Sequence, residues 1–181
     1  MKAMLVINLK NIRFVLFLAL GMLVSGENAY AKNDNIFSNS GLPLPRFVSL
    51  ASEKTNVRAG PGQKYPIKWV LNRKSLPVEV ILEFEHWRKI KDHEGAEGWV
   101  FHSLLSGKRT AIILGSDPVY AYEKPFLSNG RKSRASVYLN PFVIVDIKEC
   151  KAAWCRVSTS DYSGWIKIKS LWGVYESENI D

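Results

Sequence analysis

The sequence predicts an all-β protein that contains two copies of one small β unit. Two observations carry this prediction. A tryptophan-bearing hairpin occurs twice, at residues 84–100 and 151–166, and each ends in a Gly-Trp-aliphatic strand. An apolar strand precedes each hairpin and a leucine-bearing turn follows it, whereas no helix-period stripe of useful length is present.

Composition and turn residues divide the chain. Runs rich in Val, Ile and aromatic residues, punctuated by Gly, Pro and Asn, place the first copy at residues 47–107 and the second at 109–175. Five short strands in each copy indicate a small barrel or an orthogonal sandwich. We expect residues 32–46 to form a flexible linker and the acidic residues 176–181 to form a frayed tail. A longer basic loop at 124–134 belongs to the second copy.

The first 31 residues have the pattern of a secretory signal peptide. A basic start precedes an apolar run at 14–24, and an Ala-Tyr-Ala cleavage site ends at Ala31. As a helix that run would rise about 16 Å, which is too short for a hydrocarbon layer of roughly 30 Å. We therefore expect cleavage after Ala31, no stable membrane anchor, and a mature protein that is periplasmic or secreted.

Both cysteines, Cys150 and Cys155, lie in the part expected to be exported, where oxidising conditions favour a disulfide. A turn at 152–153 would place them opposite each other across the hairpin. Aligned on the tryptophan, the first copy has Glu83 and Arg88 at these positions. We predict that a facing pair staples both hairpins, and that the covalent pair is the stronger, since an exposed ion pair contributes roughly 0 to 1 kcal/mol. A reactive thiol or half of a metal site would lack a third ligand and a nearby base.

Strand alternation predicts the direction of the hairpin tryptophans. If their aliphatic neighbours face the core, the tryptophans share the outer face of each unit. One interpretation is that these rings pack under a loop or between the copies, as most tryptophans do in a small barrel. The other is an aromatic ligand platform ringed by Lys and Arg. The residues concerned are Trp87, Trp99, Trp154 and Trp165.

Residues 56–62 read Asn-Val-Arg-Ala-Gly-Pro-Gly and resemble the N-V-R-x-G-P-G signature of bacterial Src-homology-3-like (SH3-like, or SH3b) domains of exported proteins. The first copy is similar throughout. The second is degenerate, because residues 118–122 lack the glycines, and its ending resembles the C-terminal copy in tandem exported proteins of alphaproteobacterial type. The resemblance implies two tandem five-stranded SH3-like barrels, no intrinsic catalysis, and binding to cell wall or partner proteins.

The sequence shows no constellation typical of an enzyme. Its three histidines, His86, His93 and His102, lack metal-ligand spacing, and no nucleophile elbow is present. An acidic cluster at 92–97 fits a solvated turn better than a paired-carboxylate site, which needs a cleft. We therefore predict no catalytic residue, no metal and no cofactor.

The net charge of +8 with interleaved aromatics is also typical of nucleic-acid binders. An exported chain meets peptidoglycan and periplasmic or extracellular proteins first, so we expect no nucleic-acid partner. The predicted ligand is peptidoglycan or its stem peptides. One alternative is a secreted or periplasmic protein–protein interaction module, an effector or a scaffold. A third is an accessory role in a cell-wall hydrolase system.

The candidate ligand-binding residues lie at the loop mouth and on the tryptophan face of each copy. A basic rim would attract carboxylates of stem peptides, and the tryptophan faces would hold apolar or sugar surfaces. The candidates are Asn56, Arg58, Tyr65, Trp87 and Trp99 in the first copy and Tyr120, Trp154 and Trp165 in the second.

Overall fold

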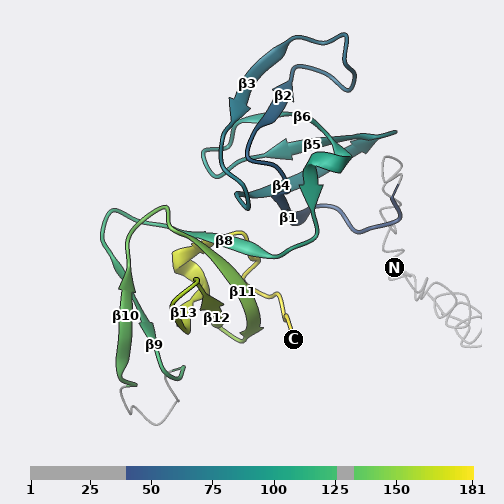
Figure 1. The fold of residues 1–181 in the computed structure, drawn as a ribbon. Coiled ribbons are helices and arrows are strands. Elements are labelled where there is room, and N and C mark those ends of the chain that lie inside the picture. The colour runs from purple at the N-terminus through teal and green to yellow at the C-terminus, as the bar shows by residue number, and fades with distance from the viewer. Residues whose placement is uncertain (1–39, 126–132) are drawn as a thin grey trace, which may run out of the picture. The chain divides into compact units, whose positions relative to one another are not determined.

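The computed structural model describes residues 40–125 and 133–181, and these fold as β-strands joined by turns (Figure 1). The expected signal peptide and its cleavage site lie outside the described residues, as do the start of the expected linker and the centre of the basic loop. Within the described ranges, no helix has the length and apolar character needed to span a membrane.

The first copy forms one antiparallel sheet in the order β3-β2-β6-β5-β4-β1-β7. A short 3-10 helix separates the last two strands in chain order, β6 and β7. The elements are β1 (Arg46–Leu50), β2 (Thr55–Arg58), β3 (Ile67–Leu71), β4 (Pro77–Phe84), β5 (Trp87–Lys91), β6 (Glu97–Phe101), η2 (His102–Leu104) and β7 (Leu105–Ser106).

The second copy repeats this topology in the order β10-β9-β13-β12-β11-β8-β14, so each strand has a counterpart in the first sheet. Its elements are β8 (Thr110–Ile113), β9 (Val119–Tyr122), β10 (Ala135–Leu139), β11 (Ile144–Lys151), β12 (Trp154–Ser158), β13 (Ser163–Lys167), η3 (Ile168–Ser170) and β14 (Leu171–Trp172).

The all-β class and the tandem arrangement are confirmed, while each sheet has seven strands rather than five. The first and last strands of each copy pair with one another, β1 with β7 and β8 with β14. The closing strands contain two residues each, which is too short for an alternation pattern to be read from sequence.

Local irregularities recur at matching positions. The pairing of β4 with β5 shifts register between Val80 and Leu82, and the pairing of β11 with β12 shifts between Ile147 and Glu149. A bulge bends its strand and increases the local twist, so β4 and β11 can each pair with two neighbours along eight residues. This shared bulge supports duplication more strongly than strand order alone.

Each copy has an apolar core to which one face of its hairpin contributes, and the core of the first copy also contains Ile112 from β8 of the second. The residues expected to point inward are no more than 1% exposed: Ile90, Val100, Val157 and Ile166. The predicted alternation is therefore confirmed for the inner face.

The Gly-Trp pair of each hairpin has a steric cause. At Gly98 an added Cβ would collide with the side chain of Val57 on β2, and at Gly164 it would lie 2.9 Å from Cβ of Ala121 on β9. Glycine lets the neighbouring strand approach closely, and the next residue then presents its large ring to the opposite face.

Aromatic side chains link the two copies. The ring of Phe47 lies 5.1 Å from that of Trp172 and 4.7 Å from that of Tyr175, measured between centroids. The hydroxyl of Tyr175 donates a 2.9 Å hydrogen bond to the buried carboxylate of Glu79. Trp172 therefore packs between the two copies.

Candidate functional site

The two hairpins are stapled at the same place by different chemistry. Glu83 faces Arg88 and Cys150 faces Cys155 in the strand register. The Glu83 carboxylate lies 3.0 Å from Nε of Arg88 and 2.5 Å from Nη2 of Arg46, while the two cysteines form a disulfide. The predicted pair of staples, one ionic and one covalent, is confirmed.

The ionic staple is buried, contrary to the expectation of an exposed pair. The side chain of Glu83 has no exposed surface because residues 40–46, expected to be a flexible linker, fold against it. The backbone N–H and the hydroxyl of Ser40 each donate a 2.8 Å hydrogen bond to its carboxylate. Burial would raise the pKa of Glu83, but hydrogen bonds from Arg46 and Ser40 outweigh it and hold the pKa below its ordinary value of 4.5.

Three of the predicted residues meet in one groove of the first copy. This first-copy groove has a volume of about 210 Å³ and lies where β2, β6 and β5 run side by side. Arg58 pairs with Trp99 and Trp87 pairs with Phe101 in the register, which brings polar groups of β2 close to aromatic rings of β5 and β6. The lining residues are Asn56, Arg58, Gln63, Trp87, Phe101, Ser103 and Leu104.

The signature loop shapes one wall of this groove. Arg58 donates hydrogen bonds to the backbone carbonyls of Tyr65 (2.8 Å) and Gln63 (3.2 Å). The ring of Tyr65 packs so closely on Gly60 that an added Cβ there would lie 2.6 Å from it. Tyr65 therefore acts through its packing and its carbonyl, and does not line the groove.

The hairpin tryptophans at the turns are covered rather than open. Trp87 is 9% exposed and packs edge-on against Phe101, with 5.4 Å between centroids. Trp154 is 8% exposed and packs edge-on against Tyr122 at 5.9 Å. Of the two interpretations, packed rings rather than an open stacking platform describe these two residues, because an aromatic ring from a nearby strand of the same copy covers each. Trp99 and Trp165 retain partial exposure.

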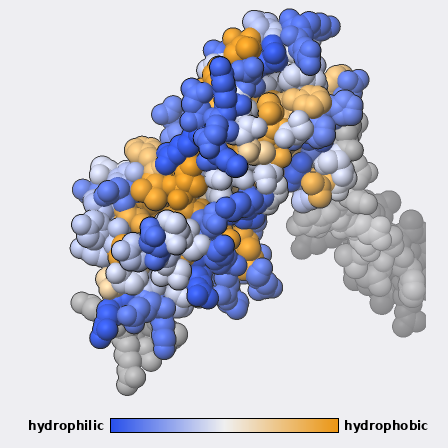
Figure 2. Space-filling model, in the orientation of Figure 1, coloured by the Kyte–Doolittle hydropathy of each residue, from blue (hydrophilic) through white to orange (hydrophobic). Residues whose placement is uncertain are grey.

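Other exposed apolar side chains are distributed over the surface. Figure 2 shows apolar patches on one face of the molecule with hydrophilic residues around them. Among the exposed residues are Tyr120 (55%) and Tyr138 (62%), which face each other across β9 and β10 with ring centroids 6.4 Å apart. The predicted residue Tyr120 thus belongs to an exposed tyrosine pair.

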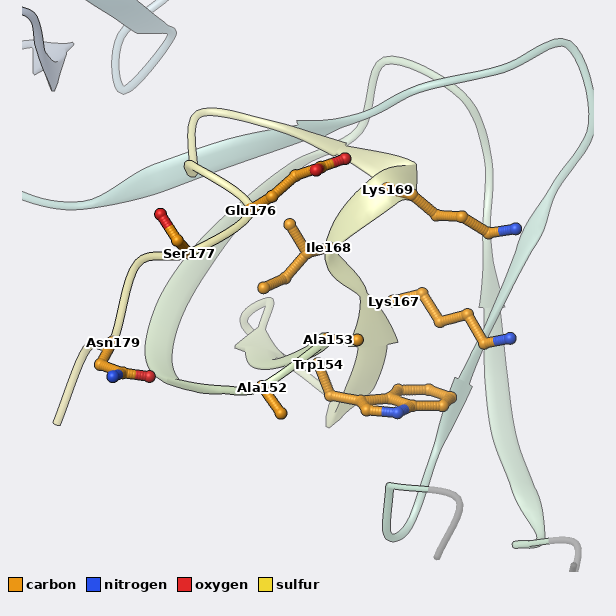
Figure 3. Close-up of a pocket in the computed structure, with 9 residues that line it drawn as sticks. All are labelled: Ala152, Ala153, Trp154, Lys167, Ile168, Lys169, Glu176, Ser177 and Asn179. Carbon is orange, nitrogen blue, oxygen red and sulfur yellow. The ribbon is translucent and has the colours of Figure 1, made fainter. Parts of the chain in front are cut away.

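The second copy contains a larger pocket, of about 670 Å³, beside its hairpin turn (Figure 3). Its walls are the turn, the end of β13 with η3, and the C-terminal segment. Trp154, Lys167 and Lys169 occupy the positions of Trp87, Phe101 and Ser103 in the first copy. We call it the second-copy pocket; it is lined by Ala152, Ala153, Trp154, Lys167, Ile168, Lys169, Glu176, Ser177 and Asn179.

Cationic and anionic groups face this pocket from different walls. Figure 3 shows Lys167 and Lys169 extending in the same direction, while the intervening Ile168 points toward the C-terminal segment. The Nζ of Lys167 lies 5.6 Å from the centroid of the Trp154 ring, a cation–π contact. The carboxylate of Glu176 extends from the C-terminal segment toward η3.

The C-terminal wall is docked, so the prediction of a frayed tail is wrong. The N–H of Cys150 donates a 2.8 Å hydrogen bond to the carbonyl of Ile180, and the N–H of Ile180 returns one of 3.2 Å. Glu178 forms an ion pair with Arg109. Burial would raise the pKa of Glu178, but hydrogen bonds from Arg109 and from the N–H of Tyr175 keep the pKa low.

The sequence prediction missed the charged residues of this pocket. Trp154 was predicted and lines it, whereas Tyr120 and Trp165 do not. Aligning the two Gly-Trp strands exposes a signal that could have been used, since Lys167 stands where the first copy has Phe101. Glu176 had no such signal, because its position depends on a bridge between the tail and β11.

The next feature is the set of side chains that could bind a metal ion or act as a free thiol. Within the described residues, no group of three or more His, Cys, Asp or Glu side chains is arranged to hold a metal ion. Both cysteines of the chain are joined in the disulfide, so neither is a free thiol.

Two sheets of one topology, each with a hairpin of the same register, define a tandem SH3-like protein. The family model for the bacterial SH3 domain matches the chain twice, at residues 51–107 and 118–173. The chain therefore belongs to the bacterial SH3 domain family and carries two tandem copies, as the signature at 56–62 indicated. No curated protein matches the chain.

Solved structures with some likeness include NlpC1 and NlpC2 from Trichomonas vaginalis, each 13% identical in sequence with a TM-score of 0.33. The NlpC1 match covers 75% of this chain and 48% of that one, and the NlpC2 match covers 74% and 50%. The chain thus spans about half the length of these proteins. A likeness of this size carries no functional argument.

Proposed function

We propose that the chain is a non-catalytic, exported binding protein whose SH3-like copies recognise peptidoglycan or its stem peptides. The observation that carries the proposal is the first-copy groove, where Asn56, Arg58 and Trp87 meet. Membership of the bacterial SH3 family and the signal-peptide pattern of the first 31 residues also support it.

The chemistry of the groove fits a short, polar peptide segment. Asn56 and Ser103 supply an amide and a hydroxyl, Arg58 supplies a cation, and the covered ring of Trp87 adds an apolar edge. Its volume of about 210 Å³ is below the range of pockets that enclose a whole drug-sized ligand, so it would hold one or two residues of a longer chain. Cleavage after Ala31 removes three cations and one anion from the chain of net charge +8, and the mature charge of +6 would favour approach to an anionic wall.

The test is pelleting of the purified protein with isolated sacculi. We expect the wild type to pellet. The double variant Asn56→Ala with Ser103→Ala should bind about tenfold more weakly, since each lost hydrogen bond is worth roughly 0.5–1.5 kcal/mol. The control variant Asn72→Ala with Ser116→Ala removes the same groups outside the groove and should bind like the wild type. Failure of the wild type to pellet would contradict the proposal.

Two further measurements address export and catalysis. Protein recovered after export should begin at Lys32, as N-terminal sequencing would show. Prolonged incubation with muropeptides should leave them unchanged, and any new product would show that the chain is an enzyme.

A protein–protein interaction role is the second candidate, favoured by the exposed pair Tyr120 and Tyr138. Tyrosines are enriched at interfaces because they offer large apolar area with a polar end. If this role is the correct one, the protein will capture a specific exported partner without binding sacculi, and Tyr120→Ala with Tyr138→Ala will abolish capture.

A further inference from the structure

We propose that the second-copy pocket binds an amino-acid-like group that carries both carboxylate and ammonium groups. This inference rests on the proposed function and deepens it, because such groups occur at the ends and side chains of stem peptides. It gives the second copy a ligand chemistry different from that of the first-copy groove.

The charges of the pocket are available to a ligand. Lys167, Lys169 and Glu176 are exposed at its rim. In the described part of the chain, none of these three has an ion-pair partner within 4.0 Å, whereas the exposed Lys108, Lys148 and Lys151 each have one. Two cations on one wall and an anion on another match a ligand with charges of both signs.

The remaining lining groups narrow the ligand further. Ala152, Ala153 and the buried Ile168 give a small apolar floor, and Ser177 and Asn179 can donate and accept hydrogen bonds. The volume of about 670 Å³ lies within the usual range for small-ligand sites. An aliphatic chain bearing polar ends would match both the floor and the rim.

Ligands that are purely anionic, purely cationic or purely apolar fit the pocket less well. A purely anionic group would approach the lysines but would be repelled by Glu176, and a purely cationic group would meet the opposite problem. A purely apolar ligand would remove water from three charged side chains without replacing their hydrogen bonds. A ligand that carries both signs of charge can pair with all three charged side chains.

The walls of the pocket are held in place before any ligand arrives. The disulfide between Cys150 and Cys155 closes the hairpin whose turn forms one wall, and Cys150 also bridges the tail through Ile180. Glu178 ties the same tail to Arg109. Such preorganisation lowers the entropy cost of binding. The first copy has Phe101 and Ser103 in place of the two lysines, so it does not offer the same charges.

The test is calorimetric titration of the purified protein with three probes at low salt. Meso-diaminopimelate carries two carboxylates and two ammonium groups, pimelate carries the carboxylates alone, and 1,5-diaminopentane carries the ammonium groups alone. We expect the first to bind about tenfold more tightly than either of the others, because it alone pairs with both signs of charge. Its binding should weaken as salt rises.

Charge-matched variants locate the site. Lys167→Gln with Lys169→Gln should weaken meso-diaminopimelate binding about tenfold. Lys124→Gln with Lys148→Gln lowers the net charge equally at exposed positions outside the pocket and should leave binding unchanged. Glu176→Gln should reduce the preference for meso-diaminopimelate over pimelate.

Three results would overturn the inference: equal binding of meso-diaminopimelate and pimelate by the wild type, no binding of any probe, or wild-type affinity in the Lys167/Lys169 double variant. These outcomes are separable from failure of the proposed function. Pelleting with sacculi that depends on Asn56 and Ser103 would stand without the second-copy pocket, and probe binding would stand without pelleting.

Discussion

The hairpins of the two copies have the same register, the same bulge and the same Gly-Trp strand, and they differ in what joins their strands. In the first, a buried carboxylate lies between Arg46 and Arg88; in the second, a disulfide occupies the equivalent positions. A link between these positions is therefore common to both copies, while its chemistry is not. The difference matters because the ionic link needs neighbouring groups that cover it and bind it, whereas the disulfide does not.

The ionic link requires a cover. Glu83 is buried by residues 40–46, and Ser40 supplies two of its hydrogen bonds. A disulfide needs no hydrogen-bond partners, so the same flank of the second hairpin can be used otherwise. There the backbone of Cys150 binds the tail through Ile180, and the tail becomes a wall of the second-copy pocket.

The largest expected effect comes from removing the carboxylate. Glu83→Ala leaves two arginines without their buried partner and should lower the free energy of unfolding by about 3 kcal/mol. That is the lower end for a broken buried pair, since Arg46 and Arg88 keep some exposure and can turn toward water. Denaturant titration measures it, with the exposed Glu94→Ala as control. A loss below about 1 kcal/mol would show that the link is not important for stability.

Removing the covalent link should cost less, which reverses the ranking expected from the sequence, because the ionic pair is buried rather than exposed. Cys150→Ala with Cys155→Ala opens a loop of few residues, and a cross-link over so short a loop is worth about 2 kcal/mol. Denaturant titration of the double variant, with the reduced wild type as comparison, gives the value. A larger loss than for Glu83→Ala would reverse the ranking of the two links.

Much of this comparison could be predicted from the sequence. Alignment on Trp87 and Trp154 gives the facing pairs, and alternation gives the inward residues. The burial of Glu83 could not be predicted, because it depends on residues 40–46, whose Asn, Ser, Gly and Pro content is typical of a linker. Composition describes how freely a segment can move, and says nothing of a specific partner elsewhere in the chain.

The candidate sites divide in the same way. Asn56, Arg58 and Trp87 could be predicted because the signature and the strand order bring them together. The burial of Trp87 and Trp154 could not, since alternation assigns a residue to a face without showing what covers that face. Glu176 reaches its pocket because the tail is attached by the bridge at Ile180 and by the ion pair of Glu178 with Arg109, and neither leaves a pattern in the sequence.

Acid should weaken the first hairpin more than the second. The folded-state pKa of Glu83 lies below its ordinary value, so its contribution to stability is complete above pH 4.5 and is lost as the pH falls through the folded-state value. The effect should be smaller than that of Glu83→Ala, because a protonated carboxyl still forms hydrogen bonds. The pKa of Glu178 is also lowered in the folded state, so its protonation in acid reduces stability as well. Between pH 7 and pH 3, the free energy of unfolding should fall less steeply in Glu83→Gln than in the wild type.

Exchanging one link for the other tests whether the two are equivalent. Glu83→Cys with Arg88→Cys places a second disulfide at positions that face each other as Cys150 and Cys155 do. Under oxidising conditions we expect the variant to remain within about 1 kcal/mol of the wild type, with the residual loss coming from an unpaired Arg46. Mass spectrometry confirms the bond, and the reduced variant should be as unstable as Glu83→Ala.

The smallest effect should come from an ion pair in the same sheet that lacks burial. Lys89 on β5 lies 2.5 Å from Glu97 on β6, and both side chains are more than a quarter exposed. Water and salt screen such a pair, so Glu97→Gln should cost about 0.5 kcal/mol and less at high salt. Glu83→Gln is the matched comparison, because it removes the same charge from a buried carboxylate that binds Arg46, Arg88 and Ser40. If denaturant titration gave equal losses for Glu97→Gln and Glu83→Gln, burial could not be what makes the first hairpin depend on its charges.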